Sequence, residues 1–250
     1  MPPAIAPCRK PFPWSFTADV LTPGLRAALG AALLVLVCVS VSAQTGGSIA
    51  LLSDYRYRGV SLSDDQPTLG LSVVHDAERG WYAGGSLIGV SLEPSGRQLQ
   101  ALGYLGLTGK LPLGLGWDAG ATAVHFSADS QYDFLEVFTG AQGERWNLRL
   151  HYAPDYFGSG ARTVYVELNG GLPLSRFVRV TAHVGALGRP GGTAAAAERW
   201  SLDGAVGLAM ARDSWGLQVD LTSGSTGSGV YPVGYDRVRG VLVLSASYAF

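Results

Sequence analysis

A base and a nucleophile stand two residues apart at His125-Phe126-Ser127. In an extended strand, residues i and i+2 lie on the same face. His125 could therefore activate the Ser127 hydroxyl for nucleophilic attack on an ester. Ala128 and Asp129 follow Ser127, and the sequence identifies no polar partner that would orient His125. A histidine near a strand end is more commonly an interfacial residue, so we assign no catalytic residue.

Arginines and carboxylates recur on the polar faces of segments with alternating hydrophobicity. Charges that line a narrow lumen can set its ion selectivity, whereas charges that pair across it would fill it. The candidate pore-lining residues are Asp54, Arg56, Arg58, Arg145, Arg149, Glu167, Arg179, Asp203, Asp220 and Arg239.

The residues that could serve metal or phosphate chemistry form no recognisable site. His75, His151 and His183 are far apart in the sequence and show no zinc-ligand spacing. The glycine-rich stretches lack the Gly-Lys-Ser/Thr ending of a phosphate-binding loop. We therefore expect no metal and no cofactor. The formal net charge of −1 gives no indication of nucleic-acid binding.

The elements that must position these residues are β-strands. Hydrophobic residues make up 47% of the chain and charged residues 15%, yet only one N-terminal stretch is continuously apolar. Insertion into a membrane would therefore use strands rather than helices. Residues 144–152 show the period of two most clearly, and residues 176–186 and 215–222 repeat it. The apolar face of the first of these segments consists of Trp146, Leu148, Leu150 and Tyr152.

This rhythm predicts an all-β fold, a transmembrane antiparallel up-and-down β-barrel of about twelve strands. An even number of strands places both ends of the chain on one side of the membrane, with longer loops on the other side. The predicted strands are 48–60, 67–76, 80–91, 97–109, 115–127, 132–141, 144–153, 161–171, 176–188, 200–211, 214–222 and 236–250.

Residues 1–43 have the features of a secretory signal peptide, which leaves residues 44–250 as the barrel domain. Arg26 precedes an apolar run of about 15 residues, too short for a spanning helix, and cleavage is predicted before Gln44. The proline-rich beginning suggests that the true start lies near residue 20. Lipidation of Cys38 is the alternative, but Val37 fits that signal poorly. Both cysteines, Cys8 and Cys38, would leave with the signal.

The last strand ends on an aromatic residue and should close the barrel against the first strand. Tyr248 and Phe250 share its apolar face and are the expected signal for the barrel-assembly machinery. This pairing would bring Arg56 and Arg58 near Arg239. Clustered arginines would favour anions unless Asp54 or another carboxylate neutralises them.

The first predicted strand carries a family resemblance. Residues 53–67 read Ser-Asp-Tyr-Arg-Tyr-Arg-Gly-Val-Ser-Leu-Ser-Asp-Asp-Gln-Pro, and residues 80–84 read Gly-Trp-Tyr-Ala-Gly. Together they resemble the opening of the TorF-type porins, conserved hypothetical outer-membrane proteins of proteobacteria. Leu62 departs from the family, where glutamine is frequent. The resemblance implies an outer-membrane barrel with a channel role, and no catalytic residues.

The favoured function is a porin of the Gram-negative cell outer membrane that allows passive diffusion of small solutes or ions. The alternative is a closed structural or gated barrel without constitutive pore activity. Less favoured are an outer-membrane lipid hydrolase that uses His125 and Ser127, and a soluble periplasmic β-sandwich. The expected partners are outer-membrane lipids, the barrel-assembly machinery, and small solutes or ions.

Overall fold

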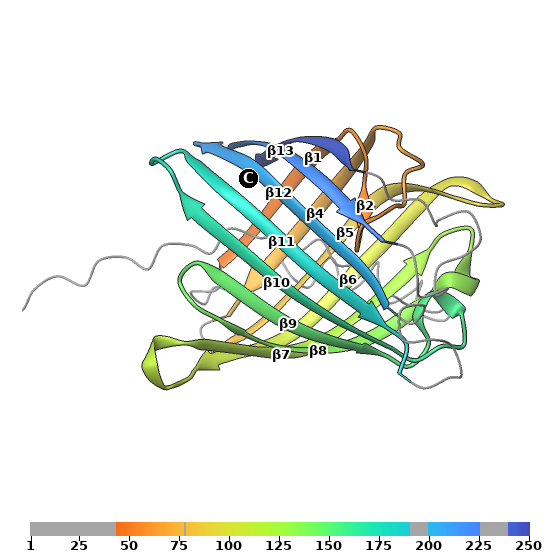
Figure 1. Cartoon of the computed structure of the whole chain (residues 1–250), viewed down its shortest axis with the longest axis horizontal. Coiled ribbons are helices and arrows are strands. Elements are labelled where there is room, and N and C mark those ends of the chain that lie inside the picture. The colour runs from red at the N-terminus through yellow and green to blue at the C-terminus, as the bar shows by residue number, and fades with distance from the viewer. Residues whose placement is uncertain (1–43, 78, 191–199, 226–239) are drawn as a thin grey trace, which may run out of the picture.

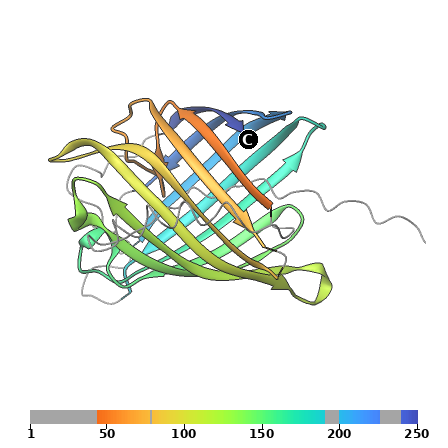
Figure 2. The same cartoon turned by 180° about the vertical axis from the view of Figure 1, so that it is seen from behind.

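The computed structural model describes residues 44–77, 79–190, 200–225 and 240–250. In this part of the chain, twelve antiparallel strands form a closed barrel, which confirms the predicted fold class (Figures 1 and 2). The barrel strands are β1 (Gln44–Leu52), β4 (Thr68–Asp76), β5 (Trp81–Leu92), β6 (Gly96–Lys110), β7 (Gly116–Phe126), β8 (Phe134–Gln142), β9 (Trp146–Ala153), β10 (Thr163–Pro173), β11 (Val178–Gly188), β12 (Trp200–Arg212), β13 (Trp215–Gly224) and β14 (Val241–Ala249). Two short strands, β2 (Arg56–Tyr57) and β3 (Val60–Ser61), pair separately from the ring.

Alternation along each strand separates an apolar outer face from a mixed inner face. On β9, Leu148 and Leu150 face outward and are 41% and 45% exposed, while His151, the next residue along the strand, faces inward and is 2% exposed. The pattern recurs around the ring, where outer leucines and valines are about half exposed. Such an apolar outer surface suits hydrocarbon rather than water.

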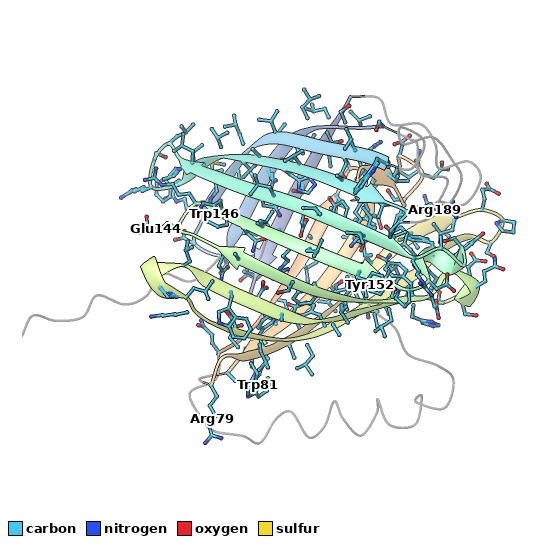
Figure 3. All side chains as sticks on the ribbon, turned by 60° about the horizontal axis from the view of Figure 1, so that its bottom comes forward. Arg79, Trp81, Glu144, Trp146, Tyr152 and Arg189 are labelled. Atoms are coloured by element: carbon cyan, nitrogen blue, oxygen red, sulfur yellow. The ribbon has the colours of Figure 1, made fainter. Side chains whose placement is uncertain are left out.

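Large aromatic residues border this apolar belt at both ends. Trp81 and Trp146 begin their strands at the end with short turns, close to Arg79 and Glu144, and Tyr152 lies toward the opposite end (Figure 3). Aromatic girdles at such positions are typical of barrels that cross a membrane.

Connections at the two ends of the barrel differ in length, as predicted for a barrel with longer loops on one side of the membrane. One end carries tight turns, such as residues 143–145 between β8 and β9, and also holds Phe250. The other end carries the segments 53–67, 127–133 and 154–162, which include the 3₁₀ turns η3 (Ser130–Tyr132) and η4 (Tyr156–Gly158). A third 3₁₀ turn, η2 (Pro112–Gly114), lies among the tight turns.

The barrel closes between β1 and β14, as predicted. Their register runs from Ser48 opposite Ala249 to Leu52 opposite Ser245. Beyond it, Gly47 and Phe250 exchange two backbone hydrogen bonds of 2.9 Å. A side chain at Gly47 would meet the Phe250 ring at 2.6 Å, so the terminal ring lies directly over this glycine.

The first strand is shorter than predicted, and its second half does something else. β1 ends at Leu52, and residues 53–67, which we call the plug, turn into the barrel. Ile49 and Leu51 face outward, but Tyr55 and Tyr57, which would share that face if the strand 48–60 were continuous, are 2% and 3% exposed. The positive φ angles of Arg58 (49°) and Gly59 (82°) fold the segment into the β2–β3 hairpin.

No helix within the described residues is long and apolar enough to span a bilayer. The predicted signal peptide, residues 1–43, lies outside the described part of the chain.

Candidate functional site

The inner face of the barrel divides into a packed region and a hydrophilic wall. On the wall formed by β1, β4, β13 and β14, small hydroxyl side chains face inward and remain partly exposed to solvent. The Ser48 and Ser72 hydroxyl oxygens, for example, lie 2.8 Å apart across two strands. Ser245 and Ser247 continue this wall and, with Arg179 and Gln218, line a small cavity. This side of the lumen is therefore polar and partly exposed to solvent.

The plug holds its shape through the Asp54 carboxylate. The Ser61 and Ser63 hydroxyls donate to one Asp54 oxygen at 2.5 and 3.0 Å. Arg56 donates to the other oxygen at 2.5 Å and also reaches Asp65 at 2.6 Å. The Ser-Asp-Tyr opening and the serines that follow thus form one local network, which neutralises Arg56.

The tip of the plug inserts the Arg58 guanidinium into the wall of the barrel. Arg58 Nη2 donates to both oxygens of Glu136 on β8, at 3.0 and 2.7 Å. The Glu136 side chain is fully buried. One of its oxygens also lies 2.8 Å from Nδ1 of His151, within hydrogen-bond distance. The attraction within a buried ion pair offsets the free-energy cost of removing both charges from water only when further hydrogen bonds satisfy the two groups. His151 supplies one such contact to Glu136.

Aromatic faces surround the same guanidinium. Its central carbon lies 4.2 Å from the ring centre of Tyr165, 4.9 Å from that of Tyr57 and 5.2 Å from that of Tyr156. These distances are within the range of cation–π attraction. Arg58 is therefore bound by one carboxylate and three rings.

A hydrophobic core joins the plug to the barrel. Tyr55, Tyr57 and Leu62 pack with inward-facing residues of β5 to β8, and with Tyr156 and Phe157 of η4. Each fully buried side chain of this size contributes roughly 1.5–3 kcal/mol. The plug is thus an integral part of the fold on this side of the lumen.

The Tyr57 hydroxyl is a polar group inside this hydrophobic core. It is buried and has no hydrogen-bond partner within the described residues. Burial raises its pKa well above the usual range, so it stays protonated.

Two further ion-pair networks occupy the inner face beyond the plug. Arg149 on β9 pairs with Asp118 on β7, and the Tyr82 hydroxyl donates to the same carboxylate at 3.0 Å. On the adjoining wall, His183 and the Tyr165 hydroxyl contact one oxygen of Asp203 at 2.7 and 3.1 Å.

The remaining predicted pore-lining residues have different positions. Glu167 faces the interior and contacts His151 at 3.3 Å, and Asp220 is half-buried beside Gln218. Arg145 is a correction: it lies exposed in the turn between β8 and β9, because β9 begins only at Trp146. Arg239 lies outside the described residues.

Sequence reasoning named Asp54, which pairs with Arg56, but missed the carboxylates that hold Arg58 and Arg149. Glu136 is separated from Arg58 by 78 residues, and Asp118 from Arg149 by 31. Their strand positions indicate that they face inward, because each alternates with an outward residue. Which arginine each would meet depends on the path of the plug and on the register of the sheet.

His125 has an orienting partner that the sequence did not identify. Its Nδ1 lies 2.7 Å from Asp133, and the other Asp133 oxygen accepts from the Phe126 amide at 2.8 Å. The Ser127 hydroxyl accepts from the Leu99 amide at 3.1 Å. His125 and Ser127 lie on the outer face, since Val124 and Phe126 are buried inside. Within the described ranges, no group of histidines and carboxylates could hold a metal ion.

Solved porins share this architecture. The KdgM porin superposes with a TM-score of 0.53 at 11% identity, covering 82% of this chain and 99% of its own. The NanC porin gives 0.51 at 10% identity, covering 82% and 98%. KdgM has also been solved in complex with disordered oligogalacturonate, with a TM-score of 0.52 at 10% identity over 83% of this chain and 99% of that one. At such identities the likeness concerns the fold.

This chain matches a family model but no curated protein. A family model, described as "Bacterial protein of unknown function (Gcw_chp)", matches residues 39–236, which include the plug and most of the barrel. The chain therefore belongs to the Gcw_chp family of bacterial proteins.

Proposed function

We propose that this chain is a porin of the Gram-negative outer membrane that allows passive diffusion of small solutes or ions. The observation that carries the proposal is the closed barrel with an apolar outer belt and a polar, partly solvent-exposed inner wall. Lipid would contact the belt, and water would enter the lumen. The porin fold of the structural neighbours supports this function, as does the resemblance to the TorF-type porins.

The route through the membrane would follow the hydrophilic wall. The plug and its core occupy the lumen beside β5 to β8, and the tip of the plug also reaches Tyr165 on β10 and Asp203 on β12, so diffusion would pass along β1, β4, β13 and β14. Barrels of about this strand number lie between those filled by side chains and those with wide aqueous channels. We therefore expect a narrow conduit suited to small solutes.

The two ends of the chain would serve export and assembly of the barrel. Residues 1–43 would direct export, and Tyr248 and Phe250 would present the final strand to the barrel-assembly machinery. The exposed position of Phe250 on the outer face of the closing seam supports that role.

The ion pairs bear on selectivity. Arg56 and Arg58 would favour anions only if no carboxylate neutralised them, and Asp54 and Glu136 fill that role. We therefore expect weak charge selectivity in place of a marked anion preference.

Planar-bilayer recording of the purified protein tests the porin. We expect conductance steps that persist over a range of salts, with nearly equal permeability of small cations and anions. No conductance at any salt or voltage would instead support the alternative, a closed structural or gated barrel, which the buried plug favours.

A second candidate is lipid hydrolysis by His125 and Ser127, favoured by the hydrogen bond of His125 with Asp133. Against it, both Asp133 oxygens help to close the loop 127–133, and the Ser127 hydroxyl accepts from a backbone amide. We expect no phospholipase or deacylase activity. Activity that is lost in Ser127→Ala would establish the hydrolase instead.

A further inference from the structure

Arg58 is held by the barrel as a small ligand would be held. Its guanidinium donates to both Glu136 oxygens and lies over the Tyr165 ring at 4.2 Å. The side chain is 4% exposed, and that of Glu136 is 0% exposed. Apart from the neighbouring Tyr57 ring of the plug, the groups that surround it come from three parts of the barrel far apart in the sequence: β8, β10 and the loop that carries η4.

The shape of the pocket matches a guanidinium better than an ammonium ion. A guanidinium can donate to a carboxylate, as Arg58 Nη2 does to both Glu136 oxygens, while its flat face lies against aromatic rings, and it is more weakly hydrated than an ammonium ion. An ammonium ion is a compact, strongly hydrated charge with no flat face. The rings of Tyr156 and Tyr165 therefore favour the flat cation.

The barrel wall supplies this pocket independently of the plug. Glu136 is fixed by His151 Nδ1 at 2.8 Å, and His151 Nε2 lies 3.3 Å from Glu167. Tyr165 is fixed by its hydroxyl, which donates to Asp203 at 3.1 Å. Glu136 and Tyr165, which face the guanidinium, would thus keep partners if Arg58 were shortened, whereas the Tyr57 hydroxyl has none within the described residues.

We propose that Glu136, Tyr156 and Tyr165 form a guanidinium-binding site in the lumen wall, that Arg58 is its tethered occupant, and that this contact keeps the plug in place. A small guanidinium ion should enter the site when Arg58 is shortened. The further consequence, that the occupied site limits conductance, rests on the proposed porin function.

Chemical rescue tests the site without reference to transport. Arg58→Ala should lower the midpoint of heat unfolding of the purified barrel, followed by its heat-modifiable migration on gels. Low-millimolar methylguanidinium should raise that midpoint in a concentration-dependent way, because a ligand that binds only the folded state stabilises it. Methylammonium, the matched cation without the planar group, should have a smaller effect.

Two controls make the rescue specific. The double variant Arg58→Ala/Glu136→Gln lacks the carboxylate and should show no rescue. Arg97→Ala removes an exposed arginine outside the plug and should show neither the loss nor the rescue. If Arg58→Ala fails to assemble, Arg58→Gln fills more of the space and allows the same titration.

The outcomes separate this inference from the porin proposal. Equal effects of methylguanidinium on Arg58→Ala and on the double variant would overturn the site. Rescue of stability with no current in any variant would uphold the site and overturn the porin. In a conducting protein, we expect Arg58→Ala to raise the current and methylguanidinium to lower it again.

Discussion

The turn at Arg58 and Gly59 decides where the tip of the plug can lie. Gly59 has a φ of 82°, and a Cβ at this position would lie 2.7 Å from the Asp203 Cβ on β12. A Cβ atom cannot rotate away as a long side chain can. Backbone conformation and close approach therefore both require glycine here.

Substitution of this glycine can be compared with a matched position. Gly96 has a φ of 70°, but a Cβ there would meet nothing within 4 Å. Gly96→Ala should cost about 1–2 kcal/mol of unfolding free energy, the usual cost of the left-handed conformation. Gly59→Ala should cost about 1–3 kcal/mol more, because of overpacking against Asp203.

Denaturant unfolding in detergent or lipid measures both variants. Equal costs for Gly59→Ala and Gly96→Ala would mean that the tip of the plug does not touch β12.

For single charged residues, the sequence predicted which face of a strand each side chain occupies better than it predicted its ion-pair partner. Arg149 and Glu167 were expected to face inward, and they do. Their partners could not be derived, because Arg149 meets Asp118 only through the order of β7, β8 and β9 and their register. Arg145 was misplaced because the alternation continued into a turn.

Among the strands, the seam between β1 and β14 holds the ring closed with few pairs. In the described part of the chain it has five register pairs, and the other barrel ladders have between six and twelve. Two hydrogen bonds between Gly47 and Phe250 extend it. The end of the chain therefore has more effect on closure than its single residue would suggest.

Deletion of Phe250 should weaken this seam. The variant loses both hydrogen bonds and the ring over Gly47. We expect the free energy of unfolding to fall by about 2–4 kcal/mol, because each hydrogen bond contributes about 1 kcal/mol and the apolar contact of the ring contributes the rest. The midpoint of heat unfolding on gels measures it. Phe250→Leu, which keeps the backbone bonds, should lose clearly less; an equal loss would contradict this role of the backbone.

Eleven of the barrel strands could be predicted from the period of two, and the end of the first could not. Tyr55 and Tyr57 continue the apolar alternation of Ile49 and Leu51, so the pattern itself gives no sign that the chain leaves the ring. The local signals were the Asp54 side chain, which captures Ser61 and Ser63, and the Arg-Gly turn. Both describe a hairpin, but neither reveals that it folds inward.

For the molecule as a whole, a membrane barrel requires that the outer face meets lipid and the inner face meets water. Val219 and Gln218 are neighbours on β13; Val219 points outward and is 41% exposed, while Gln218 points into the lumen. Val219→Arg should cost about 2–4 kcal/mol, the usual cost of a cation near the membrane midplane. Gln218→Arg should cost much less, since it faces water.

Folding of the two variants into lipid vesicles measures this difference. Similar costs for both would contradict a barrel with lipid outside and water inside.

Single-channel conductance of the wild type, measured beside that of a barrel without its plug, tests whether the lumen conducts past the plug. Leu52 and Thr68 are paired across β1 and β4, so a short Gly-Ser turn can replace residues 54–66. We predict a small conductance for the wild type and a larger one for the shortened barrel, because the plug fills one side of the lumen. Absence of current in both proteins, or the same current in both, would contradict the account.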